Sequence, residues 1–150
     1  MFNPRWFVAA VVLVLSVAAP VAAQDKPVIG KVKIATGATF VVRDGAQLPA
    51  QVGQVLHEGD GLRTGADGKV GVTLTDDTRL SLGPNSELKL DKFLFAPADS
   101  TFGLVVKFVR GAATYVSGRI AKLAPDSIRL EAPASIIGVR GTTLAIQVQP

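Results

Sequence analysis

The stretch Val70-Gly71-Val72-Thr73-Leu74-Thr75-Asp76-Asp77-Thr78-Arg79-Leu80-Ser81-Leu82 decides the fold class. Its apolar side chains alternate with small or polar ones on both sides of a central Thr-Asp-Asp-Thr segment. A period of two built from valine, leucine and threonine predicts strands that bury one face. Aspartate side chains bond the local backbone in tight turns, so we expect Asp76 and Asp77 to join two strands and to remain in solvent.

The flanking sequence continues this alternation. Upstream, Gly65-Ala66-Asp67-Gly68 is a turn signal, and downstream Gly83-Pro84-Asn85-Ser86 is another. Leu88 and Leu90 then alternate with charged residues. We therefore predict a three-stranded antiparallel meander over residues 65–91.

Glycine divides the rest of the chain into short segments. All 15 glycines follow residue 23, and most segments between them have the length of a strand rather than of a helix. Residues 93–102 are less regular and predict a longer connection. The sequence predicts a single all-β domain of about ten short, mostly antiparallel strands, arranged as a β-sandwich or an irregular flattened β-solenoid.

Residues 1–23 have the pattern of a secretory signal peptide. Arg5 precedes the apolar run from Trp6 to Val17, and small residues follow Pro20 up to Ala23. We expect cleavage after Ala23, a lead-in over 24–37 and the β-domain over 38–150. The alternative is a retained anchor, because the 18 residues from Trp6 to Ala23 carry no charge and reach the lower limit for crossing a bilayer.

The amino-acid composition limits the cellular compartments and the classes of partner that are expected. The 150 residues include no cysteine, which excludes disulfides and thiolate metal sites. Without its leader the chain would have 15 basic and 12 acidic side chains, which are dispersed instead of forming the patch of a nucleic-acid binder. We expect a periplasmic or secreted protein that has no membrane span after signal cleavage and no nucleic-acid partner.

Most glycine and aspartate motifs are interpreted as structural turns, because aspartate caps turns and glycine accepts positive φ. A calcium loop concentrates carboxylates at alternate positions, and the Gly-Asp-Gly segment at 59–61 does not. The turn residues are Gly59, Asp60, Gly65, Asp67, Gly68, Asp76, Asp77, Gly83, Pro84, Asn85 and Gly141.

Two groups of residues are candidates for partner binding. Arg140 and Thr142 flank Gly141, and a guanidinium fork suits a partner or anion. The alternative is that Arg140 pairs with a carboxylate of a neighbouring strand while Gly141 forms a bulge. Phe93, Phe95 and Phe102 would form an apolar patch for a partner or, alternatively, close one end of the core.

No catalytic pattern emerges. His57 and Glu58 are adjacent, so in an extended segment their side chains point to opposite faces. The sequence lacks the common nucleophile, zinc and phosphate-loop motifs. We expect no enzyme activity, metal or cofactor, and a hydrolase is the weakest of three functional hypotheses.

Several motifs in order resemble the FecR domain family. They are Val42-Arg43-Asp44-Gly45, the segments 53–68 and 72–82, Pro84-Asn85-Ser86-Glu87-Leu88-Lys89-Leu90, Ala132-Pro133-Ala134 and Gly138-Val139-Arg140-Gly141-Thr142. The resemblance covers residues 38–148. It departs from the family at the central turn, which lacks glycine, and at Ala132, where threonine is usual.

The resemblance implies an exported all-β module that contacts another molecule in the bacterial envelope, as a sensing or regulatory accessory. We do not expect the transmembrane signalling role of the namesake, because its anti-sigma segment, spanning helix and receptor-docking region have no match here. The alternative function is binding of peptidoglycan or another polysaccharide. It is weakened by the scarcity of aromatic side chains, since the single Trp lies in the leader and the single Tyr is Tyr115.

Overall fold

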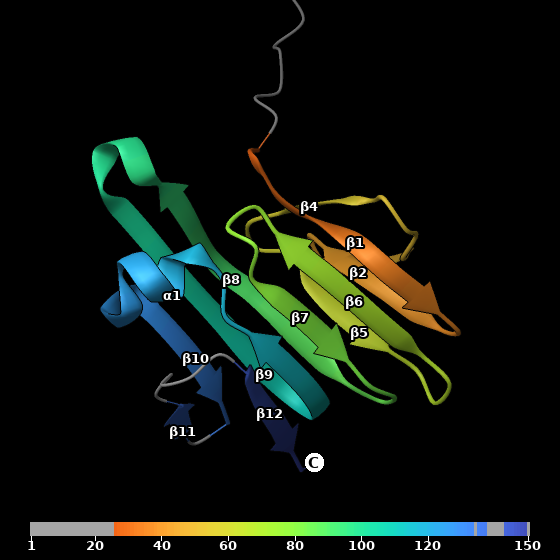
Figure 1. Cartoon of the computed structure of the whole chain (residues 1–150). Helices are drawn as coiled ribbons and strands as arrows, with labels where there is room; N and C mark the ends of the chain where they lie inside the picture. The colour runs from red at the N-terminus through yellow and green to blue at the C-terminus, as the bar shows by residue number, and fades with distance from the viewer. Residues whose placement is uncertain (1–25, 134, 138–142, 150) are drawn as a thin grey trace, which may run out of the picture.

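The structure, a computed structural model, describes residues 26–133, 135–137 and 143–149. Within these residues the chain forms one curled, mostly antiparallel sheet that does not close into a barrel (Figure 1). The all-β prediction is confirmed. The sheet folds over so that two halves face each other across one core, which is closer to a sandwich than to a solenoid.

We name the two halves by their position in Figure 1. In the front half-sheet the strands lie in the order β4-β1-β6-β7-β9-β12. Its own strands are β1 (Val28–Thr36), β4 (Val55–His57), β6 (Lys69–Leu74), β7 (Arg79–Leu82) and β12 (Thr143–Val148).

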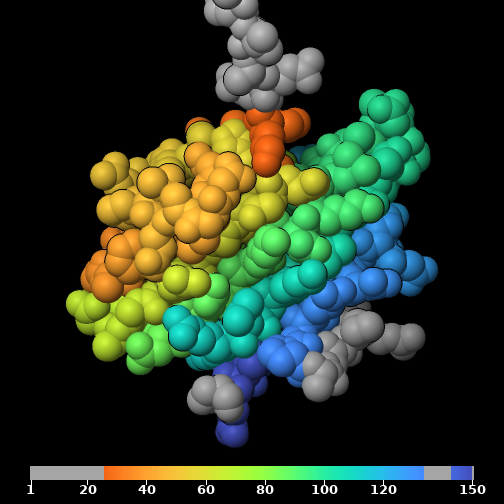
Figure 2. All heavy atoms as spheres, turned by 180° about the vertical axis from the view of Figure 1, so that it is seen from behind, coloured from red at the N-terminus to blue at the C-terminus, as the bar shows by residue number. Residues whose placement is uncertain are grey.

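In the back half-sheet the order is β3-β2-β5-β8-β9-β10-β11, and only β9 and β10 run parallel. Figure 2 shows this side as diagonal bands from orange at β2 and β3, through green and teal at β8 and β9, to blue at β10. Its own strands are β2 (Thr39–Arg43), β3 (Ala46–Pro49), β5 (Gly61–Thr64), β8 (Glu87–Ala96), β10 (Ile128–Ala132) and β11 (Ser135–Ile137).

Strand β9 (Thr101–Val116) belongs to both halves. Its first part pairs with β8 and β10, and its last part pairs with β7 and β12. The change of partners falls near Gly111, which has φ +80° and leaves no room for a side chain beside Ser86. Glycine is required here because it alone combines positive φ with such close packing.

The core lies between the halves. Val72 and Leu80 of the front half and Leu62, Leu88 and Leu90 of the back half are at most 2% exposed. Each such side chain contributes roughly 1.5–3 kcal/mol when it leaves water. The apolar residues therefore alternate along these strands because every second side chain enters one shared core.

The predicted meander is only partly right. Strands β6 and β7 form the expected antiparallel pair, with Val70 opposite Leu82 and Thr73 opposite Arg79. The third strand is wrong, because β8 pairs with β5 and β9 in the back half. Residues 83–86 carry the chain from one half to the other, and alternation alone does not distinguish a crossing from a hairpin.

The predicted long connection over residues 93–102 is also wrong. Strands β8 and β9 continue as a hairpin that extends past the neighbouring strands, with the 3-10 turn η1 (Pro97–Asp99) at its tip (Figure 1). A bulge between Leu90 and Lys92 shifts the alternation by one residue. This shift explains why the segment looks irregular in the sequence.

Two further segments complete the described chain. Helix α1 (Arg119–Leu123) and the 3-10 turn η2 (Pro125–Ser127) connect β9 to β10. Strand β1 lies within the segment 24–37, and no helix of the described chain is long and apolar enough to cross a membrane. The predicted signal peptide and its cleavage point lie outside the described residues.

Candidate functional site

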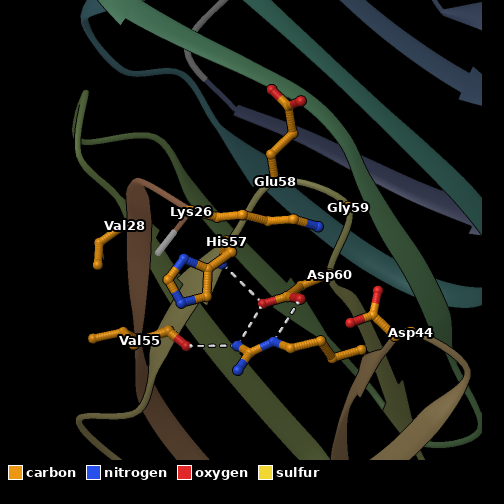
Figure 3. Close-up of a pocket in the computed structure, with 9 residues that line it drawn as sticks. Lys26, Val28, Asp44, Val55, His57, Glu58, Gly59 and Asp60 are labelled. Atoms are coloured by element: carbon orange, nitrogen blue, oxygen red, sulfur yellow. Dashed lines mark hydrogen bonds and ion pairs between the residues drawn. The ribbon is translucent and has the colours of Figure 1, made fainter. Parts of the chain in front are cut away.

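Charged side chains gather around a cavity of about 470 Å³ beside His57 (Figure 3). The start of β1, strand β4 and the turns that follow β2 and β4 surround it. It is lined by Lys26, Val28, Arg43, Asp44, Val55, His57, Glu58, Gly59 and Asp60.

The centre of this cavity wall is a two-pronged ion pair. Arg43 donates from Nε to Asp60 Oδ1 over 3.0 Å and from Nη2 to Asp60 Oδ2 over 2.8 Å. The same Nη2 donates to the Val55 carbonyl, and the His57 N–H donates to Asp60. The hydrogen bond to Asp60, and the charges of Asp60 and Asp44, raise the pKa of Arg43. The guanidinium thus ties three segments together through Nε and Nη2.

His57 and Glu58 turn away from each other, as Figure 3 shows. His57 Nδ1 lies 3.1 Å from the Pro27 carbonyl, whereas Glu58 accepts the Phe93 N–H at 3.1 Å. The cavity lining contains no serine, threonine or cysteine that would serve as a nucleophile. In the described chain no three His, Cys, Asp or Glu side chains gather closely enough to hold a metal ion.

The solvent exposure of Asp76 differs from the expectation. It is fully buried, and its carboxylate accepts the Thr78 N–H at 3.1 Å, the Thr78 hydroxyl at 2.7 Å and the Ile120 N–H at 3.2 Å. The predicted solvent exposure is wrong for Asp76, because α1 packs over the β6–β7 turn. Asp77 has φ +70°, is exposed and lies 3.6 Å from Arg119.

Tyr115 lies below the same turn. Its side chain is fully buried, and its hydroxyl has no hydrogen-bond partner among the described residues. Burial, followed by the charge of Asp76, raises the pKa of Tyr115 to about 12. The front half-sheet therefore holds a neutral phenol next to a buried carboxylate.

The other predicted turn residues pack chain segments together. Gly65 donates its N–H to the Ala38 carbonyl, Asp67 accepts the Ala38 N–H, and Gly68 is packed too tightly against Ala38 for a side chain. Gly59 has φ +89°.

A second buried polar contact holds the crossing from β7 to β8. Thr64 donates its hydroxyl to the Gly83 carbonyl at 2.6 Å and accepts the Ser86 N–H at 2.9 Å. Ser86 donates to the Pro84 carbonyl and accepts the Ala112 N–H, while Asn85 takes φ +51°. The sequence did not single out Thr64 or Ser86.

The three candidate phenylalanines fall into two environments. Phe93 is only 7% exposed and packs in the core, so it presents almost no surface. Phe95 and Phe102 are half-buried near the end of the β8–β9 hairpin, with ring centres 6.0 Å apart. The Arg119 guanidinium lies 4.6 Å from the Phe95 ring centre. Arg140, Gly141 and Thr142 lie outside the described residues.

The family model described as FecR protein matches residues 60–150. The chain belongs to the FecR family. The match spans β5 to β12, and the resemblance proposed for residues 38–59 precedes it. No curated protein and no solved structure matches the chain.

FecR proteins are associated with the cell envelope and are generally regulatory and non-catalytic. Membership therefore indicates a sensing or regulatory accessory role in the envelope. The cavity beside His57, with its guanidinium committed to Asp60, agrees with a structural use of these residues.

Proposed function

We propose that this FecR domain is a non-catalytic interaction module, exported by the leader at residues 1–23, that binds another protein of the bacterial envelope. Family membership supports the regulatory role and the envelope location. The surface that carries the proposal is the outer edge of β12.

Strand β12 is an edge strand of the front half-sheet within the part of the chain that the structure describes. It pairs with β9 along one side only, and the described residues supply no strand for its other side. Its sequence from Thr143 to Val148 contains no charge and no proline. Natural edges usually carry a lysine, a proline or a bulge that prevents pairing with another chain, so an unprotected edge suits a partner that adds a strand.

The residues that the sequence suggests for partner binding fall into two groups, one beside the β12 edge and one away from it. Arg140 and Thr142 directly precede β12 in the sequence, and we propose that they contact the same partner. Phe95 and Phe102, at the end of the β8–β9 hairpin, are a separate candidate contact. Phe93 is only 7% exposed, so it offers almost no surface to a partner.

The test is site-specific photocrosslinking in the envelope. A photoreactive residue at Gln147 on β12 is compared with one at Gln47, an exposed position on edge strand β3 of the other half-sheet. We expect one specific protein adduct from position 147 and none from position 47. A second variant, Ala145→Lys, places a charge on the exposed side of β12 and should abolish that adduct.

Two results would oppose the proposal. Equal adducts from both positions would show nonspecific collision. Absence of adducts, with the protein retained on purified peptidoglycan, would favour the polysaccharide alternative. Edman sequencing of the exported protein tests the leader separately, with Gln24 expected as the first residue.

A further inference from the structure

The outer face of the front half-sheet carries only positive charges. Strands β1, β6, β7 and β12, together with residues 111–116 of β9, contain no aspartate or glutamate. They contain four basic residues, and all four are exposed: Lys31, Lys33, Lys69 and Arg79.

The strand register places Lys31, Lys69 and Arg79 on one surface, whereas Lys33 is exposed in the bulge of β1 between Val32 and Ile34 and has no register partner. Lys31 lies opposite Thr73, and Thr73 lies opposite Arg79, so the three form one row across β1, β6 and β7. Lys69 precedes Thr73 by four residues on β6, where Val70, Val72 and Leu74 point into the core. With strands about 4.8 Å apart and about 3.3 Å per residue, the cations spread over roughly 10 by 13 Å.

None of the four cations has an ion-pair partner among the described residues. Two turn carboxylates that flank these strands form no ion pair with the four cations: Asp67 accepts the Ala38 N–H, and Asp77 lies 3.6 Å from Arg119. Four like charges held in one plane repel one another, so a molecule that supplied negative charge to this plane would be attracted.

The surface between the cations carries one exposed aliphatic side chain. A row of small residues crosses it, in which Gly71, Ser81, Thr114 and Ala145 lie opposite one another in turn. Ile34 continues this row on β1, is 55% exposed, and lies across Gly71 on the outer face. A shallow groove of about 440 Å³ follows the row toward β12.

We propose that this face binds the surface of an anionic phospholipid bilayer. A flat array of lipid phosphates would meet the three aligned cations at once, and Ile34 would enter the boundary between headgroups and acyl chains. An acidic protein would also supply negative charge, and the polyglutamate comparison below distinguishes it from a bilayer. The β12 edge proposed for protein binding borders this face, so the two interactions would hold the partner near the membrane.

The experiment measures sedimentation with vesicles of phosphatidylcholine mixed with phosphatidylglycerol, and with vesicles of phosphatidylcholine alone. The protein is purified after export. We expect binding to the anionic vesicles only, weakening as salt increases, because screening shortens the range of the attraction. All variants share one N-terminus, so its contribution cancels between them.

Two triple variants with the same change in net charge form the matched pair. Lys31→Gln, Lys69→Gln and Arg79→Gln together remove three cations from the front face. Lys89→Gln, Lys107→Gln and Arg129→Gln remove three from the back face. The front variant should bind anionic vesicles about a hundredfold more weakly, at about fivefold per cation, whereas the back variant should keep most of its affinity.

Further variants complete the design. Ile34→Ser should weaken the binding that remains at high salt. Circular dichroism confirms that each variant is folded.

Equal losses in both triple variants would reduce the effect to net charge and overturn the assigned face. Binding to soluble polyglutamate but not to vesicles would replace the bilayer by an acidic polypeptide.

Discussion

The outer faces of the two half-sheets differ in whether their basic side chains have carboxylate partners. On the back face Glu87 lies between Arg63 and Arg110, and Asp91 lies between Lys89 and Lys107. On the front face four cations have no carboxylate partner among the described residues. The back face pairs its cations with carboxylates of the same or neighbouring strands, whereas the charge of the front face remains available to another molecule.

The two halves also differ in their buried polar contacts, and the largest effect is expected there. Asp76→Ala should lower the free energy of unfolding by about 3 kcal/mol, because three N–H and O–H donors lose their acceptor inside the protein. Urea unfolding measures the change. Asp77→Ala is the control, since its exposed side chain makes only a weak ion pair. Equal losses in both variants would locate the effect in the turn backbone.

Tyr115 gives the front half a pH response. Its pKa of about 12 in the folded chain lies above the usual value of 10. The unfolded chain therefore loses its proton first as pH rises, and the free energy of unfolding should fall between about pH 10 and pH 12. Because the chain has one tyrosine, absorbance at the phenolate band follows this group alone. Titration at the ordinary pKa in the folded protein would contradict its burial.

A smaller effect is expected for the back face. Glu87→Gln breaks the ion pairs to Arg63 and Arg110, which should cost about 1 kcal/mol of unfolding free energy at low salt. The cost should shrink as salt is added, because both arginines are partly exposed. Thermal unfolding at two salt concentrations checks this, and a cost independent of salt would indicate lost packing.

The smallest expected effect is a change in melting temperature that has opposite signs on the two faces. Lys69→Gln on the front face should cause no loss of stability, and at low salt it should raise the melting temperature slightly by reducing like-charge repulsion. The matched substitution Lys107→Gln should lower it, because Lys107 lies 3.4 Å from Asp91. The opposite pair of signs would mean that the front cations have partners within the protein.

Local chemistry was readable from the sequence, and long-range pairing was not. The alternation around Leu74 and Leu80 predicted a hairpin that the structure contains. The burial of Asp76 depends on Ile120, which follows it by 44 residues, and no local pattern encodes that contact. The absence of acidic residues from the front strands was visible in the sequence, but it acquired meaning only when the register brought those strands together. Arg140 and its neighbours remain predictions.

Because β9 belongs to both half-sheets, it also sets the point in synthesis at which the protein can fold. This strand pairs with β7, β8, β10 and β12, so neither half-sheet is complete until residue 116 has left the ribosome. Contacts between segments so distant in sequence form slowly. The first hundred residues therefore emerge without the strand that joins the two halves, so we expect the shared core to form only after β9 has been synthesised.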